Sequence, residues 1–202
     1  MTVVGILLLA VIGYGLLRFV TAHGVGYERS RLAARVAVIG RSLDAEMIKK
    51  LTGREADQDT PAFRSIVARL ARLQTDNGDC RFVYLMGRKD GAVIFLADAT
   101  DPSSPDYSPP GEVYEEASPE LIRSFAIGEP FVEGPVSDRW GTWVSGLAPI
   151  RDPSSQRVLA VVGMDVNADR WRITLGIGRI VAALATGLLA WAMLIFARRF
   201  RA

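Results

Sequence analysis

The hydrophobic positions of this chain gather in one long run at each end. Residues 2–22 and 173–197 each contain a single charged side chain, Arg18 in the first and Arg179 in the second. A helix of about 20 apolar residues spans the roughly 30 Å hydrocarbon core of a bilayer, and an arginine near a helix end extends its charge to the interface. The two runs therefore predict two transmembrane helices.

The charges beside these runs predict an orientation. Basic flanks favour the cytoplasmic side, and the arginines of residues 198–202 follow the second run directly. Both termini would then lie on the cytoplasmic side of the membrane, with residues 28–170 outside. Val20 and Ala22 leave the alternative of a cleaved signal peptide. We favour a retained helix, because the apolar run is longer than a usual signal core and continues into a helical pattern.

Between the runs, apolar residues first recur at the spacing of one helical face, which predicts a long helix over residues 28–51. The stripe consists of Leu32, Val36, Ile39, Leu43 and Met47. It either packs on its own domain or pairs with a second copy in a parallel homodimer. A shorter helix is predicted over residues 60–76, because Thr60 suits the N-cap position and Pro61 the first turn.

Short β-rich runs follow over residues 81–166. They are RFVYLMG, AVIFLAD, PFVEGPV, TWVSGLAPI and RVLAVVGMDV. Turn sequences such as RKDG and SDRWG separate most of them. Five short strands joined mostly by tight turns indicate one antiparallel sheet with helices on a face, which is an α+β fold.

One connection in this region is long. Residues 99–128 are rich in proline and acidic side chains, and positions 98–138 hold ten acidic residues against one basic residue. Ser118 and Pro119 predict the start of a short helix that ends at Gly128. A connection of this length is a functional lid or a disordered segment, and its tyrosines favour an ordered lid.

This order of elements resembles the Cache family of extracytoplasmic PAS-like sensor domains. The resemblance covers residues 28–170 and is carried by FVYLMGRKDG, SPPGEVYEEASPEL, GEPFVEGPVSDRWGTWVSGLAPIRD and VVGMDV. These stretches are similar to the single Cache modules that precede bacterial histidine kinases, diguanylate cyclases and chemoreceptors. The resemblance implies a PAS-like five-stranded antiparallel sheet with a long N-terminal helix and a lid loop, flanked by two transmembrane helices. It also implies a ligand between sheet and lid, and a dimer through the first helix.

The resemblance assigns further roles to a few residues. Relatives that bind amino acids hold the ligand's amine with an acidic residue near the end of the last strand, and Asp165 in VVGMDV matches that position. Arg139 and Trp140 loosely match the pair that holds the carboxylate. Alternation along the fourth strand places Trp143 and Ser145 on one face, where a large apolar surface meets a hydroxyl. The small residues of the opposite face suit close packing of a helix.

Each candidate also has a purely structural explanation. Asp165 follows the apolar run LAVVGM, so its carboxylate is at least partly buried, and it would accept backbone N–H groups or cap the next helix. The aromatic candidates would be core residues or anchors of the lid. The complete set of candidate ligand-binding residues is Tyr84, Tyr107, Tyr114, Arg139, Trp140, Trp143, Ser145 and Asp165.

The sequence disfavours several other classes of protein. It has no nucleophile-elbow, zincin or P-loop motif, so we expect no catalytic residues. With one histidine, His23, and one cysteine, Cys80, it lacks the usual zinc ligands, and we expect no metal and no cofactor. Residues 28–172 hold 22 acidic and 19 basic side chains, which disfavours nucleic-acid binding.

The sequence therefore predicts a membrane-anchored sensory input region rather than an enzyme. It would bind a small molecule outside the cell and pass the signal through the second apolar helix to a cytoplasmic output module absent from this chain. A histidine kinase is the favoured output, and a diguanylate cyclase comes next. The alternatives are a membrane-tethered extracytoplasmic enzyme and a protein-interaction module without a ligand.

Overall fold

The computed structural model describes residues 3–199, which divide into two compact units. Residues 29–170 form one unit, and the segments up to Glu28 and from Trp171 form the other. The helices in chain order are α1 (Val3–Arg41), α2 (Ala45–Ile48), the 3-10 helix η1 (Glu55–Asp59), α3 (Pro61–Asp76), α4 (Pro119–Ile127) and α5 (Ala168–Arg199).

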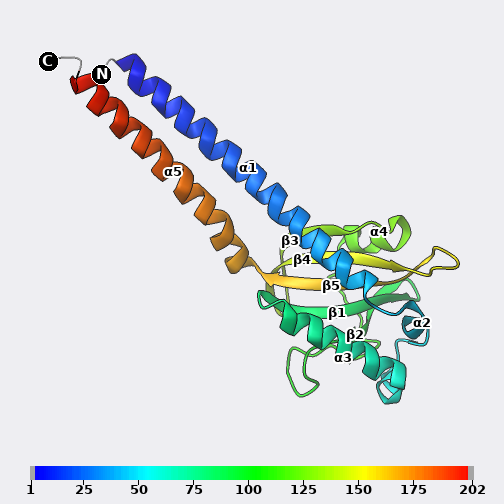
Figure 1. The fold of residues 1–202 in the computed structure, drawn as a ribbon. Coiled ribbons are helices and arrows are strands. Elements are labelled where there is room, and N and C mark those ends of the chain that lie inside the picture. The colour runs from blue at the N-terminus through cyan, green and yellow to red at the C-terminus, as the bar shows by residue number, and fades with distance from the viewer. Residues whose placement is uncertain (1–2, 200–202) are drawn as a thin grey trace. The chain divides into compact units, whose positions relative to one another are not determined.

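The strands form one antiparallel sheet in the unit of residues 29–170 (Figure 1). They are β1 (Cys80–Lys89), β2 (Ala92–Asp98), β3 (Phe131–Asp138), β4 (Gly141–Arg151) and β5 (Val158–Asn167). Their order across the sheet is β2-β1-β5-β4-β3, so the last strand of the chain occupies the centre. The predicted α+β fold with a five-stranded antiparallel sheet is confirmed.

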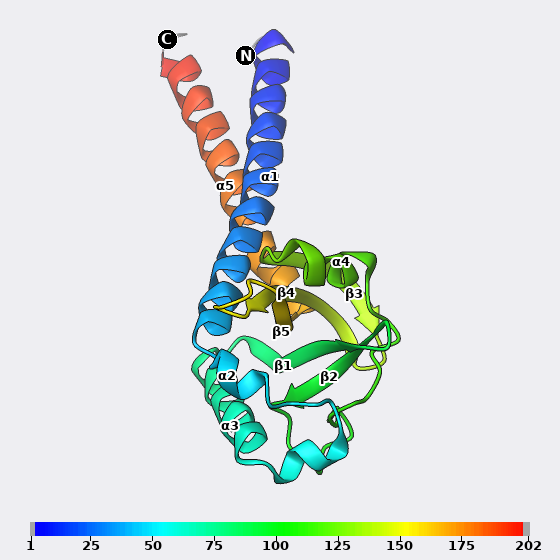
Figure 2. The ribbon, with the colours of Figure 1, turned by 90° about the vertical axis from the view of Figure 1, so that its right-hand side faces the viewer.

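One face of the sheet packs on α1. Gly146 of β4 leaves no room for a Cβ beside Leu32, and Gly40 of α1 lies against Ala148 and Val162. The predicted small face therefore receives a helix. Four residues of the apolar stripe are buried within this one chain: Leu32, Val36, Ile39 and Leu43. The stripe thus packs on its own domain, and Figure 2 shows α1, α2 and α3 on the opposite side of the sheet from α4.

The long helix predicted over residues 28–51 is wrong at its C-terminal end. The helix stops at Arg41, and the separate short helix α2 follows. Asp44 begins α2 because its carboxylate accepts the backbone N–H of Glu46 at 2.8 Å, and the hydroxyl of Ser42 donates to the carbonyl of Ile39 at 2.8 Å. Local side-chain hydrogen bonds of this kind compete with a continuous helix.

The two other predicted helices are confirmed. In α3, Thr60 accepts the backbone N–H of Phe63 at 3.2 Å as the N-cap. In α4, Ser118 accepts the N–H of Leu121 at 3.0 Å, and the helix ends at Gly128 in the left-handed conformation with φ of 73°. A side chain at that φ would be strained, which explains the glycine there.

The lid predicted over residues 99–128 is ordered and joins the edge strand β2. The backbone N–H of Gly111 donates to the carbonyl of Phe95 at 2.8 Å. The N–H of Tyr114 donates to the carbonyl of Val93 at 2.9 Å. These bonds place residues 111–114 alongside the outer edge of β2. The middle of the lid is therefore fixed to the domain by its backbone.

The opposite edge of the sheet is contacted by a side chain of α1. The guanidinium of Arg29 donates to the carbonyl of Val132 at 2.9 Å and to that of Gly134 at 3.1 Å. Both carbonyls belong to β3, which pairs with β4 on its other side. Arg29 therefore satisfies acceptors that this edge strand would otherwise present to water.

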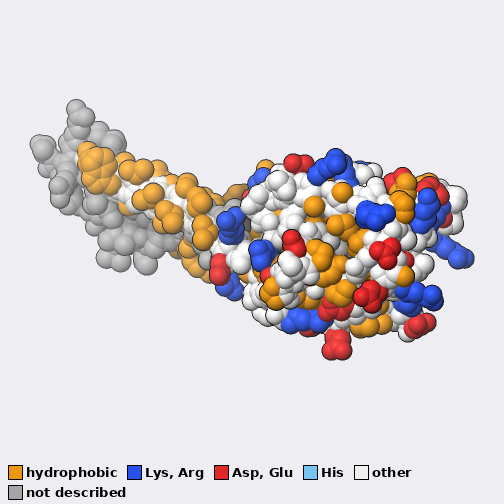
Figure 3. All heavy atoms as spheres, turned by 90° about the horizontal axis from the view of Figure 1, so that it is seen from below, with side chains coloured by type: hydrophobic (Ala, Val, Ile, Leu, Met, Phe, Trp, Pro, Cys, Tyr) orange, Lys and Arg blue, Asp and Glu red, His pale blue; other side chains and the backbone are white. Residues whose placement is uncertain are grey.

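The second unit consists of the outer parts of α1 and α5. A Cβ on Gly13 would lie 2.6 Å from the methyl of Thr186, so the glycine permits close contact between these helices. Large apolar side chains are exposed along the described part of this unit, whereas charged side chains of both signs are spread over the visible face of the other unit (Figure 3).

The two membrane spans expected at residues 2–22 and 173–197 are not found in the described part of the chain. No helix there is both long and apolar enough to cross a bilayer. The side chains of residues 2–10 and of several residues between 174 and 197 lie outside the described part. Residues 200–202 of the predicted cytoplasmic segment also lie outside it.

The close approach of α1 to β4 generates a stability prediction. Gly146→Ala would place a Cβ 2.9 Å from Cγ of the buried Leu32, and such overpacking costs about 1 to 3 kcal/mol. Gly78→Ala is the matched control, because no atom lies within 4 Å of its added Cβ. Urea unfolding followed by circular dichroism measures both; equal midpoints would contradict the packing described.

Candidate functional site

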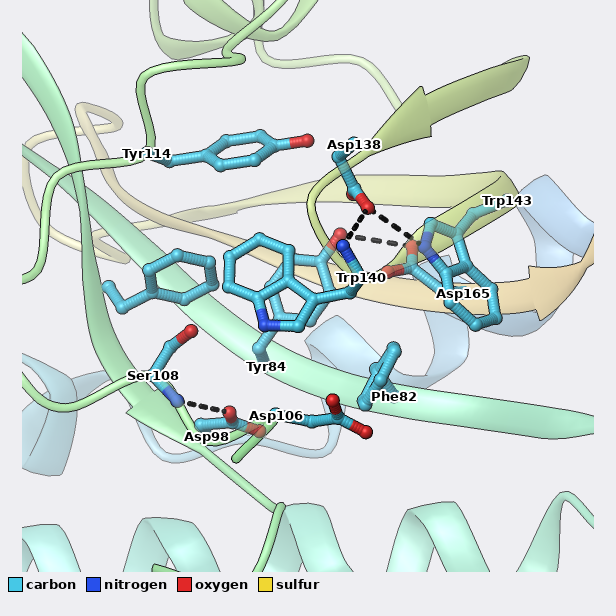
Figure 4. Close-up of a pocket in the computed structure, with 11 residues that line it drawn as sticks. Phe82, Tyr84, Asp98, Asp106, Ser108, Tyr114, Asp138, Trp140, Trp143 and Asp165 are labelled. Atoms are coloured by element: carbon cyan, nitrogen blue, oxygen red, sulfur yellow. Dashed lines mark hydrogen bonds between the residues drawn. The ribbon is translucent and has the colours of Figure 1, made fainter. Parts of the chain in front are cut away.

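A pocket lies between the lid and the face of the sheet that is turned away from α1 (Figure 4). It holds about 330 Å³ of empty space, including the part open to solvent. All five strands, the lid and the β3–β4 turn contribute to it. Its lining consists of Phe82, Tyr84, Phe95, Asp98, Asp106, Ser108, Tyr114, Asp138, Trp140, Trp143 and Asp165.

The floor of the pocket is a tyrosine paired with a buried aspartate. The phenol of Tyr84 donates to Oδ1 of Asp165 at 3.0 Å. The two residues come from neighbouring strands, where Tyr84 is paired with Gly163 across the β1–β5 ladder. Its ring occupies the place that a Cβ of Gly163 would need. A glycine at this position therefore lets the ring lie flat on β5 and reach the carboxylate two residues along.

Burial raises the pKa of Asp165 to about 7, against hydrogen bonds from Ser145 and Tyr84 that lower it. The charges of Asp138 and Glu133 raise the pKa further. Asp165 is only 5% exposed, so its charged form has lost most of its hydration. Burial also raises the pKa of Tyr84 well above its usual value, so this phenol stays protonated and remains a donor.

Aromatic rings form the walls. Phe95 meets three other rings in edge-to-face contacts, with centroids 5.6 Å away for Tyr84, 5.7 Å for Tyr114 and 5.9 Å for Trp140. Such contacts stabilise a fixed arrangement beyond the effect of area alone. Tyr114 belongs to the lid, so this cluster ties the lid to the sheet.

Asp138 positions both tryptophans at one end of the pocket. Its Oδ1 accepts the backbone N–H of Trp140 at 2.9 Å and that of Gly141 at 3.0 Å. The same oxygen accepts the indole N–H of Trp143 at 3.1 Å. No donor among the described residues reaches Oδ2, the second oxygen, with a hydrogen bond, so that oxygen is available to a ligand.

Two further aspartates lie at the other end. Asp98 is 4% exposed and accepts the backbone N–H groups of Thr100 at 2.9 Å and of Ser108 at 3.0 Å. Burial raises its pKa, while these donors lower it. Asp106 pairs with Arg81 at 2.8 Å. The pocket thus has carboxylates at both ends and in its floor.

Arg139 lies outside this lining and holds the lid. Its guanidinium pairs with Glu112 at 2.9 Å and with Glu116 at 3.4 Å, both on the lid. It also stacks on the ring of Trp140, 4.4 Å from the centroid. The side chain of Arg139 therefore links the β3–β4 turn to the lid.

The structure brings together most of the residues proposed from the sequence. Five of the eight line the pocket: Tyr84, Tyr114, Trp140, Trp143 and Asp165. Ser145 lies opposite Asp165 across the β4–β5 ladder, and its hydroxyl donates a hydrogen bond to the carboxylate of Asp165. Tyr107 is half-buried on the lid and is not among the lining residues.

Sequence reasoning missed six lining residues: Phe82, Phe95, Asp98, Asp106, Ser108 and Asp138. Phe82 could have been predicted, because it lies two residues before Tyr84 on the same strand and so on the same face of the sheet. Asp138 had a weaker signal, since an aspartate at the start of a turn commonly accepts the backbone N–H group two residues later. In the part of the chain that the structure describes, no cluster of His, Cys, Asp and Glu is arranged to hold a metal.

Comparison with solved structures identifies the fold. The ligand-binding domain of the Campylobacter jejuni chemoreceptor Tlp3, solved in complex with L-valine, is 14% identical over 80% of this chain and 60% of its own, with a TM-score of 0.50. The sensor domain of Escherichia coli DcuS is 16% identical over 73% of this chain and 97% of its own, also with a TM-score of 0.50. The fold is the Cache, or PAS-like, fold.

The predicted Cache resemblance is thus confirmed at the level of fold. A Tlp3 complex with 4-methylisoleucine gives the same result, with 13% identity and a TM-score of 0.50. The chain spans about 60% of the length of the Tlp3 chains that it matches. No protein-family model matches the sequence, and no curated protein does.

The buried aspartate of this Cache fold predicts a pH dependence of stability. Asp165 ionises near 3.8 in the unfolded chain and at about 7 in the folded one. Between these values the folded state holds a proton that the unfolded state has lost, so the free energy of unfolding falls as pH rises from about 4 to about 7. Relative to Asp165→Asn, we expect the native chain to lose on the order of a few kcal/mol over this interval.

Urea unfolding of both proteins at several pH values measures this difference. Comparison with the isosteric variant removes the contributions of titrating groups that do not interact with Asp165. Stability curves that run parallel for the two proteins would show that Asp165 is not desolvated.

Proposed function

We propose that residues 29–170 are the ligand-binding input domain of a bacterial receptor. The observation that carries this proposal is the pocket under the lid, whose floor holds a desolvated carboxylate fixed by Tyr84. A buried charge without a partner is unfavourable for folding alone. Its presence in an aromatic pocket is expected when a ligand completes the site.

The position of the pocket supports a signalling role. Asp165 lies on β5, and α5 begins three residues later at Ala168 without an intervening loop. Trp143 of the pocket is paired with Asn167, whose side chain accepts the N–H of Asp169 at 2.8 Å in the first turn of α5. A ligand that displaces the end of β5 would therefore move the start of α5 directly.

The output side of the proposal comes from the sequence resemblance. We infer that α5 leads toward an output module, with a histidine kinase favoured over a diguanylate cyclase. The extracytoplasmic location stays a prediction. The parallel homodimer through residues 28–51 also stays a prediction, and it would use the side of α1 that carries the exposed Val38, because the apolar stripe is buried in its own domain.

The two alternative functions have less support. An extracytoplasmic enzyme needs a nucleophile or a base aimed at a reacting atom, and no histidine, lysine or cysteine is among the described residues that line the pocket. An interaction module without a ligand would have its lid packed flat on the sheet. The space under this lid favours a ligand.

A thermal-shift screen of the purified chain against amino acids, carboxylates and amines tests the proposal. A ligand at 100 times its Kd stabilises the folded state by about 2.7 kcal/mol, which raises the Tm by about 5 to 10 °C for a chain of this size. Tyr84→Phe keeps the ring and removes the donor to Asp165, so it should weaken binding at least tenfold.

Tyr14→Phe is the matched control, because Tyr14 is exposed and lies in the other unit. Trp143→Ala is less informative, since this ring is buried and packs edge-to-face on Phe82 with centroids 5.1 Å apart. A screen without any stabilising compound, or a hit that Tyr84→Phe leaves unchanged, would contradict a ligand site at this pocket.

A further inference from the structure

The pocket's charged groups all have one sign. Four aspartates line it, namely Asp98, Asp106, Asp138 and Asp165, and no lysine, arginine or histidine is among the lining residues. Asp106 is balanced by Arg81, but Asp138 receives only neutral N–H donors. A ligand entering this space meets a negative potential.

Two arginines contact residues of the lining, and both already have acidic partners. Arg139 is held by Glu112 and Glu116 of the lid, and its guanidinium lies on the ring of Trp140. Arg81 pairs with Asp106 and lies over the ring of Phe82, 5.1 Å from the centroid. Neither is free to pair with a carboxylate inside the pocket, and an anionic group there would face Asp138 and Asp165 instead.

The aromatic walls add a second, independent preference. Six rings line the space: Phe82, Tyr84, Phe95, Tyr114, Trp140 and Trp143. Ring faces attract ammonium groups, above all those with methyl substituents, whose hydration is weak. Rings and carboxylates together form the surroundings that bind an organic cation.

From these observations we propose that the ligand is a small organic cation, an amine or a quaternary ammonium compound, that carries no carboxylate of its own. This inference rests on the proposed sensory function and narrows it. The ammonium group binds between Asp138 and Asp165, where Oδ2 of Asp138 is the available acceptor. The cation replaces the missing charge partner of Asp165.

Matched pairs of compounds test this specificity by isothermal titration calorimetry on the intact chain. Choline and glycine betaine share a trimethylammonium group, and only betaine has a carboxylate. Isobutylamine and L-valine share the amine and the branched side chain, and only valine has a carboxylate. We expect the member without a carboxylate to bind at least tenfold more tightly in at least one pair.

Variants locate the cation within the pocket. Asp165→Asn and Asp138→Asn keep the shape of each side chain and remove its charge, so each should weaken binding of the better amine at least tenfold. Asp90→Asn is the control, because Asp90 is an exposed residue of the β1–β2 turn. Circular dichroism of each variant checks that it is folded.

The outcomes separate this inference from the function on which it rests. Equal or tighter binding of the carboxylate-bearing member in both pairs would overturn the cation specificity and leave the sensory function in place. Tight binding of a simple carboxylate such as acetate or succinate would do the same. Amine binding that both aspartate variants leave unchanged would overturn the site. Absence of binding by every compound in the screen would overturn both proposals.

Discussion

The desolvation of one carboxylate at the centre of the sheet constrains the structure around it. Asp165 lies on the middle strand with neighbours on both sides, and water has little access to it. A charge in such a place requires donors from the adjacent strands, which Tyr84 and Ser145 provide. Tyr84 reaches it only because Gly163 has no side chain. The residue types on three strands thus depend on this one carboxylate, and no lysine, arginine or histidine is among the described residues that line its pocket.

The two faces of the sheet were largely predictable because their information is local. Alternation along β4 separates Trp143 and Ser145 from the small residues that receive α1, and this pattern can be seen in the sequence. The caps at Thr60 and Ser118 are equally local, since each side chain bonds to an N–H three residues away. The hairpin pairs β1–β2, β3–β4 and β4–β5 then follow from the short turns, whereas the pairing of β1 with β5 joins distant parts of the chain.

The parts that escaped prediction depend on partners distant in sequence or on competing local bonds. The break after Arg41 arises from Ser42 and Asp44, whose hydrogen bonds outweigh an otherwise continuous apolar stripe. Arg139 was assigned to the ligand because it stands beside Trp140, but its partners are glutamates about 25 residues earlier in the lid. Asp98 gave no clear signal, because one of its backbone donors, Ser108, lies ten residues later in the lid.

The lid also has a consequence for the solubility of the domain. An unpaired edge of a β-sheet can pair with the edge of another molecule and start aggregation. Residues 111–114 of the lid occupy the free side of β2 with backbone hydrogen bonds, while Arg29 caps carbonyls on the free side of β3. The lid segment that covers the pocket therefore also protects one edge of the sheet from pairing with another molecule. If the ligand enters and leaves while this segment stays in place, the edge strand β2 is not exposed during binding.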